Sequence, residues 1–218
     1  FLNWCYMFKD LGNYRKSYVK GELVEENLPS NPMDLFNSWF SNVDSKKIEI
    51  EPNAMSLSTV GPDKYPGTRI VLLKKITKDG FVFFSNYDST KGISISKNNR
   101  VCLSFFWSSQ EQQVIVKGNA SKINDLESTE YFNSRPIGSK IGAIVSNQSQ
   151  IIPSREYLEK KYESIKSKKT NIKKPKNWGG YLVVPISYEF WQGRDNRLHD
   201  RIIYQKNDNL WDIKRLSP

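Results

Sequence analysis

The side chains best suited to chemistry gather toward the C-terminal end of the chain. Arg194, Arg197 and Arg201 fall within eight residues, and the only histidine, His199, lies among them. If residues 197–204 form a β-strand, Arg197, His199 and Arg201 project from one face of it. Cations on a shared face favour an anionic ligand such as a phosphate or a carboxylate. An exposed basic strand with solvated charges explains the same spacing equally well.

The segment before these cations is predicted to be a strand that positions them. Residues 181–191 are rich in β-branched and aromatic side chains, and Pro185 divides the run into two parts. Gln192 and Gly193 then supply a turn into the cationic segment. The predicted elements therefore form a hairpin whose second strand carries the arginines.

Three short motifs place uncommon residues in a fixed order here. They are EFWQG at residues 189–193, RLHDR at residues 197–201 and RLSP at residues 215–218. Together they resemble the C-terminal signature of the pyridoxamine 5'-phosphate oxidase family, and the likeness covers roughly residues 15–218. The resemblance implies a mostly β fold, the FMN-binding split barrel with peripheral helices. It also implies a homodimer with FMN at the subunit interface.

The resemblance further implies an activity and a set of site residues. FMN-dependent oxidation of pyridoxamine or pyridoxine 5'-phosphate would give pyridoxal 5'-phosphate, with oxygen as electron acceptor and hydrogen peroxide as by-product. Arg197 and His199 would be the catalytic pair, holding the substrate ring against the flavin. The expected substrate ligands are Lys74, Tyr131, Arg135, Ser139, Arg197, His199, Arg15 and Tyr18. The expected cofactor contacts are Arg69, Ile70, Val71, Leu72, Leu73, Lys74, Phe84, Ser85, Thr90, Lys91, Gln113, Gln148, Ser149, Trp191 and Arg201.

Several of these residues suit phosphate on physical grounds alone. Lys91 lies near a predicted helix start, where free backbone N–H groups favour an anion. Tyr131, Arg135 and Ser139 are four residues apart and offer a phenol, a guanidinium and a hydroxyl. Because Pro136 interrupts this spacing, we predict that a helix ends there and continues into a turn. Solvated polar residues at a helix end are the alternative interpretation.

The chain departs from the family pattern at three positions. Thr90 and Gln112 stand where the family commonly has arginine, and Glu51 stands where an aspartate is common. The change at Thr90 predicts a weaker grip on the flavin phosphate, although threonine can still donate one hydrogen bond. We assign no role to Glu51.

Composition bounds the class of protein. A chain of 218 residues with 38% hydrophobic residues fits one domain, which we place at residues 29–218 after a mobile arm at residues 1–28. No apolar run approaches the ~20 residues that span a bilayer, so we expect no membrane partner. Cys5 and Cys102 lack metal or disulfide spacing, which predicts a reducing, cytoplasmic setting and no metal site.

The net charge of +10 has three explanations: nucleic acid, an anionic cofactor and substrate, or lysine-rich solubility. The densest cluster, at residues 160–176, contains glutamates and a single aromatic residue, which favours a solvated helix running into a loop over a nucleic-acid groove. A nucleic-acid-binding protein would also leave the RLHDR motif unexplained. We therefore expect small-molecule and oxygen partners and no nucleic acid.

The remaining sequence predicts an antiparallel barrel or sandwich. Asn31 can cap a helix that starts at Pro32, and residues 78–80 form a tight hairpin turn. The expected strands cover residues 54–60, 68–76, 81–85, 101–107 and 113–123, and further helices cover residues 126–132 and 155–168.

Other catalytic classes lack their motifs. No dinucleotide fingerprint, P-loop or nucleophile elbow is present. Asp200, on the opposite strand face from His199, is not placed to orient the imidazole as a triad acid does. A split-barrel flavoprotein with another redox substrate remains the main alternative. Such a protein would not need the set formed by Tyr131, Arg135 and Ser139.

Overall fold

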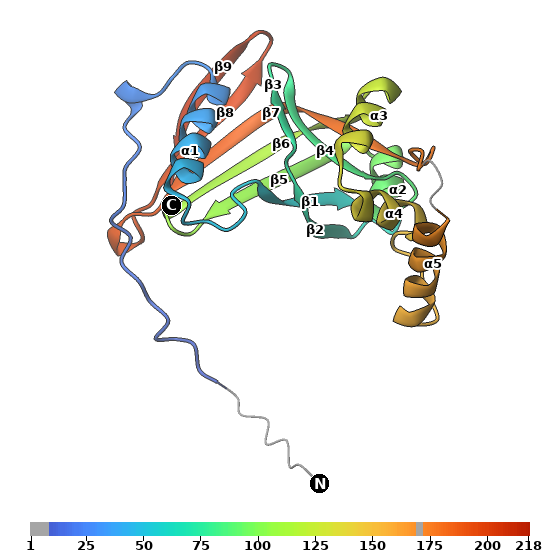
Figure 1. Ribbon diagram of the computed structural model, residues 1–218. Helices are drawn as coiled ribbons and strands as arrows, with labels where there is room; N and C mark the ends of the chain where they lie inside the picture. The colour runs from blue at the N-terminus through green and yellow to red at the C-terminus, as the bar shows by residue number, and fades with distance from the viewer. Residues whose placement is uncertain (1–8, 169–171) are drawn as a thin grey trace.

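A computed structural model describes residues 9–168 and 172–218, which form a curled antiparallel sheet with helices at its two ends (Figure 1). The strands are β1 Ala54–Val60, β2 Pro66–Leu72, β3 Lys75–Thr77, β4 Gly80–Asn86, β5 Arg100–Trp107, β6 Gln112–Lys122, β7 Trp178–Gln192, β8 Asp200–Asn207 and β9 Leu210–Leu216. The helices are η1 Glu25–Asn27, α1 Pro32–Lys46, α2 Thr90–Lys97, α3 Asp125–Ser134, α4 Ile137–Val145, α5 Arg155–Ser167 and η2 Asp195–Arg197.

Strand β7 organises this sheet, because it pairs with three other strands. It runs beside β6 over nearly its whole length, while its other edge pairs first with β4 and then with β8. Pro185 lies at a register shift opposite Gly118, where the ladder tolerates a residue without an N–H group. The two ends of β7 therefore belong to different parts of the molecule, one beside α3 and the other beside β8 (Figure 1).

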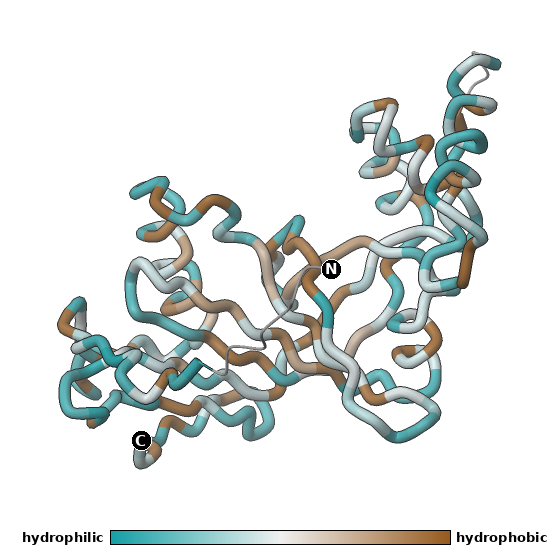
Figure 2. The backbone as a smooth tube through the Cα atoms, turned by 90° about the horizontal axis from the view of Figure 1, so that it is seen from below, coloured by the Kyte–Doolittle hydropathy of each residue, from teal (hydrophilic) through white to brown (hydrophobic). Residues whose placement is uncertain are grey.

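The core lies on the inner face of the sheet. Along β5, the side chains of Val101, Leu103, Phe105 and Trp107 are 0–5% exposed, while the residues between them are more exposed. This alternation is the period of two that a half-buried strand requires. Figure 2 shows the same distribution, with hydrophobic positions concentrated in the central strands and hydrophilic ones in the loops.

Helix α1 covers this core. As predicted, the Asn31 side chain accepts the N–H of Met33, and Pro32 is the first helical residue. Phe36 is fully buried, with its ring centroid 4.8 Å from that of Phe81 and 5.1 Å from that of Phe105. Truncating such a side chain to alanine typically costs about 3–5 kcal/mol.

Two predicted elements need correction. The strand predicted at residues 68–76 is divided into β2 and β3, because Leu73 and Lys74 leave the ladder. The turn predicted after Pro136 is instead the start of α4, since a proline just before a helix ends one helix and fits the entry to the next. The other strands and helices expected up to residue 192 are confirmed, with ends that shift by a few residues.

The outer face of the sheet is mixed in character. Ile70 is 65% exposed and Phe106 is 57% exposed. Polar Ser104 lies two residues before Phe106 on β5, and polar Gln113 lies opposite Phe106 on β6 and donates to Ser104. Apolar side chains on an otherwise polar face are typical of a surface that another molecule covers. Within the described ranges, no helix is both long enough and apolar enough to cross a membrane.

Candidate active site

A cavity of ≈ 370 Å³ lies at the end of the sheet beside α3 and α4. We call it the cation pocket, because Lys74, Lys91 and Arg135 line it. Ile70, Val71 and Leu72 from β2 and Phe84 from β4 supply an apolar wall. The cavity therefore combines positive charge with a surface on which a flat ring could lie.

Lys91 is the most deeply buried cation of this pocket, with 6% of its surface exposed. Its Nζ donates to Ser85 Oγ at 3.0 Å and to Ser89 Oγ at 3.2 Å. Ser89 also caps α2, as a helix start at this position requires. Burial, assisted by the charge of Arg69, lowers the pKa of Lys91 to about 8. A buried ammonium held only by hydroxyls would be stabilised by an anion.

Arg135 is a second cation of the pocket with a hydrogen-bond donor that lacks an acceptor. Its Nη1 is buried and makes no hydrogen bond within the described residues, while its guanidinium carbon lies 4.8 Å from the Trp178 ring centroid. Tyr131 stacks on Phe84 with ring centroids 3.8 Å apart. Burial lowers the pKa of Arg135 and raises that of Tyr131. The aromatic rings thus fix a guanidinium that has an unused hydrogen bond.

The other residues expected around this phosphate region lie near it. Arg69 Nη1 donates to Thr59 Oγ1 at 2.8 Å and to the carbonyls of Leu57 and Gly67. In the described part of the chain, no ion pair involves Arg69, Lys74, Lys91 or Arg135. This group of cations therefore carries no internal carboxylate to neutralise it.

Residues after α3 complete the rim. Gly142 and Ala143 of α4 line the cavity, as does Ser146 just after the helix. Exposed Ser139 precedes Gly142 and Ala143 by three and four residues on the same helical face. Gln148 also lines the cavity, and its Oε1 lies 3.4 Å from Ser85 Oγ. The predicted substrate set of Tyr131, Arg135 and Ser139 is thus divided between two helices.

Seven of the expected cofactor residues do not line this cavity: Arg69, Leu73, Thr90, Gln113, Ser149, Trp191 and Arg201. Leu73 is 4% exposed and belongs to the hydrophobic core. Thr90 and Ser149 are exposed, and Ser149 has a φ of 72°. Their side chains make no contact with the cation pocket as the chain is folded here.

A second cavity, of ≈ 580 Å³, lies at the opposite end of β7. We call it the arm cavity, because Arg15 and Tyr18 of the N-terminal segment form one wall and Arg197 and His199 form the other. Tyr18 lies with its ring centroid 5.7 Å from those of both Trp191 and His199. The structure therefore gathers the expected ring-binding residues, but far along β7 from the cation pocket.

The strand predicted at residues 197–204 is wrong at its start. Residues 195–197 form η2, Arg197 has a left-handed φ of 61°, and β8 begins only at Asp200. Arg197, His199 and Arg201 therefore do not share one strand face. His199 is instead fixed by its neighbour in the loop, since its Nδ1 accepts the backbone N–H of Arg194 at 3.1 Å.

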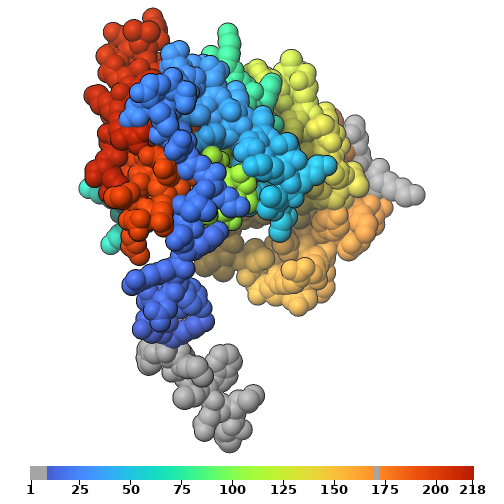
Figure 3. Space-filling view, turned by 90° about the vertical axis from the view of Figure 1, so that its left-hand side faces the viewer, coloured from blue at the N-terminus to red at the C-terminus, as the bar shows by residue number. Residues whose placement is uncertain are grey.

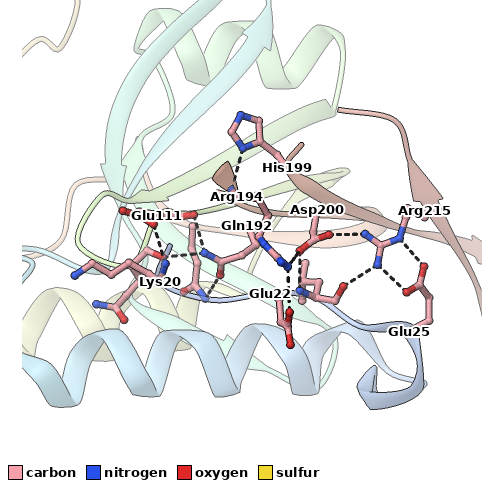
Figure 4. Close-up of polar contacts among 12 residues, drawn as sticks. Lys20, Glu22, Glu25, Glu111, Gln192, Arg194, His199, Asp200 and Arg215 are labelled. Carbon is pink, nitrogen blue, oxygen red and sulfur yellow. Dashed lines mark hydrogen bonds and ion pairs between the residues drawn. The ribbon is translucent and has the colours of Figure 1, made fainter. Parts of the chain in front are cut away.

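Asp200 contacts partners other than His199, although the two residues do not lie on opposite faces of one strand, because His199 precedes β8. The Asp200 carboxylate accepts from Arg194 Nη1 at 2.8 Å and from Arg215 Nη1 at 2.6 Å (Figure 4). It also accepts the Leu23 N–H at 3.1 Å. It therefore orients arginines and the N-terminal segment, and does not contact the imidazole as a triad acid would.

Gln113, Trp191 and Arg201 form a row across three strands. Gln113 is opposite Trp191 in the β6–β7 ladder, and Trp191 is opposite Arg201 in the β7–β8 ladder. Arg201 donates to Glu189 Oε1 at 2.9 Å and to the Ser217 carbonyl at 2.8 Å. Residues directly opposite across strands project from the same face, so these three expected flavin contacts lie together.

Sequence reasoning missed one residue of this region, Glu111. Its side chain is 1% exposed and accepts the backbone N–H groups of Val19 and Lys20; Figure 4 shows it beside Lys20. No motif signals it, since its partners lie 92 and 91 residues away in the sequence. The sequence shows only that Glu111 is an acidic residue in the short connection between two predicted strands.

A curled antiparallel sheet with a pocket lined by cations places the chain in the class of split-barrel proteins. Residues 45–169 match the family model described as pyridoxamine 5'-phosphate oxidase. Residues 178–218 match the model of the pyridoxine 5'-phosphate oxidase C-terminal dimerisation region. The chain therefore belongs to the pyridoxamine 5'-phosphate oxidase family, as its motifs predict.

Individual relatives agree with this assignment. The chain is 53% identical over 214 residues to a pyridoxine/pyridoxamine 5'-phosphate oxidase of Christiangramia forsetii, covering 97% of this chain and 100% of the relative. It is 46% identical to the enzyme of that name from Leptospira biflexa, covering 96% and 99%.

A solved structure supports the same fold. The crystal structure of PhzG from Burkholderia lata, in complex with tetrahydrophenazine-1-carboxylic acid, superposes with a TM-score of 0.85 at 25% identity and covers 90% of this chain and 98% of that one. The expected split-barrel fold is thus confirmed.

Proposed function

We propose that this protein oxidises pyridoxamine 5'-phosphate and pyridoxine 5'-phosphate to pyridoxal 5'-phosphate. The observation that carries the proposal is the cation pocket, where Lys91 and Arg135 are partly buried without a carboxylate partner. An anion would stabilise such a pocket, and both the substrates and FMN carry a phosphate. The family relatives of the same name support this choice of substrate.

The residues present fit FMN. Lys91, Arg69 and Ser85 would hold its phosphate, and the apolar wall formed by Ile70, Val71 and Leu72 would lie against its ring system. FMN, when bound, accepts a hydride from the substrate carbon and passes the electrons to oxygen. The protein contributes binding, orientation and electrostatics.

The substrate would be held at both ends. Tyr131, Arg135 and Ser139 would bind its phosphate, with Lys74 beside them, and the unused Nη1 of Arg135 is a donor that a phosphate oxygen would satisfy. Arg197 and His199 would hold the ring in contact with the flavin. Since hydride transfer depends on two rings being in register, these two residues act by position.

We further propose that each active site is completed by a second copy of the chain. The cation pocket lies at the Trp178 end of β7 and the arm cavity at the Gln192 end, and a strand rises about 3.3 Å per residue. One small substrate cannot contact both regions of one chain along a 15-residue strand. A homodimer with FMN between its subunits would bring them together, and the dimerisation region at residues 178–218 supports this.

Flavin identity and reduction test the proposal together. The purified protein should be yellow, and heat should release FMN, not FAD, on chromatography, because the pocket suits one terminal phosphate. Under anaerobic conditions, pyridoxamine 5'-phosphate should bleach the colour, and admitting oxygen should restore it with formation of pyridoxal 5'-phosphate. Recovery of FAD, or a colour that the substrate leaves unchanged, would contradict the proposal. We also expect the protein to work in the cytoplasm, on the basis of its sparse cysteines.

A further inference from the structure

The N-terminal segment is fixed to the sheet by a buried carboxylate. Glu111 Oε2 accepts the backbone N–H of Val19 at 2.8 Å and that of Lys20 at 3.0 Å. Its Oε1 lies 3.3 Å from Lys16 Nζ, and within residues 9–168 and 172–218 that oxygen has no hydrogen bond. Hydrogen bonds to a charged group are stronger than neutral ones, so this is the kind of contact that can order an exposed segment.

Glu111 also contacts the loop that carries the proposed ring-binding residues. Its carbonyl accepts the N–H of Gly193 at 2.8 Å and Nε2 of Gln192 at 3.2 Å. One residue, in the turn between β5 and β6, therefore fixes both the N-terminal segment and the start of the loop at residues 193–199. Figure 4 shows Lys20, Gln192 and Glu111 converging in this way.

The position of Tyr18 depends on this contact. Tyr18 precedes Val19, and its ring lies beside Trp191 and His199. A Cβ built on Gly193 would come within 2.7 Å of Tyr18 Cγ, so the ring lies directly over a residue without a side chain. Figure 3 shows the blue N-terminal segment passing along the orange-red surface of the C-terminal strands.

The burial of Glu111 and the docking of the segment require each other. A buried carboxylate costs free energy unless donors satisfy it. Among the described residues, the partners of the Glu111 carboxylate are the backbone N–H groups of Val19 and Lys20 and the ammonium of Lys16. Conversely, those residues are mostly exposed and bury little apolar surface of their own. The carboxylate is therefore the main attachment of this part of the segment.

We propose that Glu111 is a positioning residue that docks residues 16–20 and thereby places Arg15 and Tyr18 as one wall of the arm cavity. The docking itself follows from the contacts of this chain. Its consequence for catalysis, a tighter hold on the substrate, rests on the proposed function. A second contact, from Asp200 to the Leu23 N–H, fixes the segment farther along and leaves residues 15–18 to Glu111.

Limited trypsin digestion tests the docking without reference to activity. In Glu111→Ala, cleavage after Arg15 and Lys16 should become about tenfold faster or more, because proteolysis follows the population of the undocked segment. Glu111→Gln should stay close to the parent protein, since its amide oxygen can still accept the two N–H groups. Mass spectrometry of the released N-terminal fragment gives the rates.

Glu49→Ala is the matched control. Glu49 lies between α1 and β1, and its Oε1 accepts the N–H of Ser109 in the β5–β6 turn at 2.8 Å. This second carboxylate therefore contacts the turn to which Glu111 belongs, but its hydrogen bonds do not involve the N-terminal segment. Its loss should leave cleavage after Arg15 and Lys16 unchanged. Lys20→Pro tests the same contact by changing the N-terminal segment. Proline lacks the N–H that Lys20 donates to Glu111, while the turn between β5 and β6 is unchanged. It should accelerate cleavage as Glu111→Ala does.

Steady-state kinetics on the FMN-loaded protein tests the consequence. Glu111→Ala and Lys20→Pro should raise KM for pyridoxamine 5'-phosphate about tenfold, with flavin content and kcat little changed, whereas Glu111→Gln and Glu49→Ala should match the parent. Unchanged cleavage in Glu111→Ala, or equal acceleration in Glu49→Ala, would refute the docking. Faster cleavage with an unchanged KM would refute the positioning role. If the parent protein fails to oxidise the substrate, the proposed function falls while the digestion still decides the docking.

Discussion

The cation pocket and the arm cavity treat positive charge differently. In the cation pocket, Lys91 and Arg135 are partly buried and lack a carboxylate in the described chain. Near the arm cavity, Arg194 pairs with Glu22 at 3.3 Å and with Asp200 at 2.8 Å. Arg215 likewise pairs with Asp200 and Glu25, each at 2.6 Å.

This difference indicates what each region still needs. The cation pocket is incomplete electrostatically and requires a ligand anion, because a buried charge without a partner is costly. In the arm cavity, Arg194 is neutralised by carboxylates of the chain, and the exposed Arg15 and Arg197, which form no ion pair among the described residues, are left for a ligand. The first region should therefore determine affinity for phosphate groups, and the second should determine how a bound ring is oriented.

The largest effect should come from the orienting region. Arg197→Lys should lose about 100-fold in kcat/KM, because lysine lacks the planar fork and a misplacement of about 1 Å can cost that much. Flavin content and dimerisation should remain normal. The measurements are pyridoxal 5'-phosphate formation under saturating FMN and the absorbance of bound flavin.

Arg201→Lys, unlike Arg197→Lys, should lower the flavin content. Arg201 lies opposite Trp191 and holds Glu189 and the Ser217 carbonyl together, so lysine should lose part of this arrangement and shed flavin. If Arg197→Lys keeps nearly full activity, Arg197 is only a solvated surface charge and does not hold the substrate ring.

A smaller effect is expected in the cation pocket. Arg135→Ala should raise KM for pyridoxamine 5'-phosphate roughly 10- to 100-fold, since a hydrogen bond to a charged group contributes about 1.5–3 kcal/mol. FMN content should not change. Arg155→Ala, at an exposed arginine of α5, is the control and should leave KM unaltered. Loss of flavin with a normal KM would mean that Arg135 binds the cofactor.

The pH dependence of FMN binding tests the buried charge of Lys91. Burial lowers its pKa from 10.5 to about 8, so above pH 8 the ligand-free protein loses the proton that a phosphate requires. The Kd for FMN should therefore rise by up to about tenfold per pH unit above this value. Fluorescence titration between about pH 7.5 and 9.5 measures it, and Lys91→Gln should abolish the slope.

Stability of the FMN-free protein should move the opposite way. Between pH 8 and 10.5 the unfolded chain binds more protons at Lys91 than the folded chain does, so this residue makes the free energy of unfolding increase with pH. If the Kd for FMN does not change between about pH 7.5 and 9.5, Lys91 does not contact the phosphate.

The smallest effect is expected at Thr90, outside the cation pocket. Thr90→Arg should tighten FMN binding by less than about tenfold, because Thr90 is exposed at the start of α2 and an exposed contact is worth less than a buried one. Titration of the two FMN-free proteins in parallel measures this. An unchanged Kd would mean that the loop before α2 no longer follows the family pattern.

Much of this protein follows from short stretches of sequence. The Asn31 cap, the hairpin turn before Gly80 and the helix start at Ser89 are set by side chains within a few residues of the backbone that they affect. Alternation along β5 likewise fixes which residues enter the core. The motifs at residues 189–201 were specific enough to predict the family.

Tertiary structure decided how the site residues are arranged. The left-handed turn at Asn196 and Arg197 and the division of β2 from β3 depend on packing that no local pattern encodes. The contact of Glu111 with Val19 joins residues 92 positions apart, and that of Asp200 with Leu23 joins residues 177 apart. Caps and periodicity act over about one helical turn, whereas such contacts exist only once the sheet has brought distant segments together.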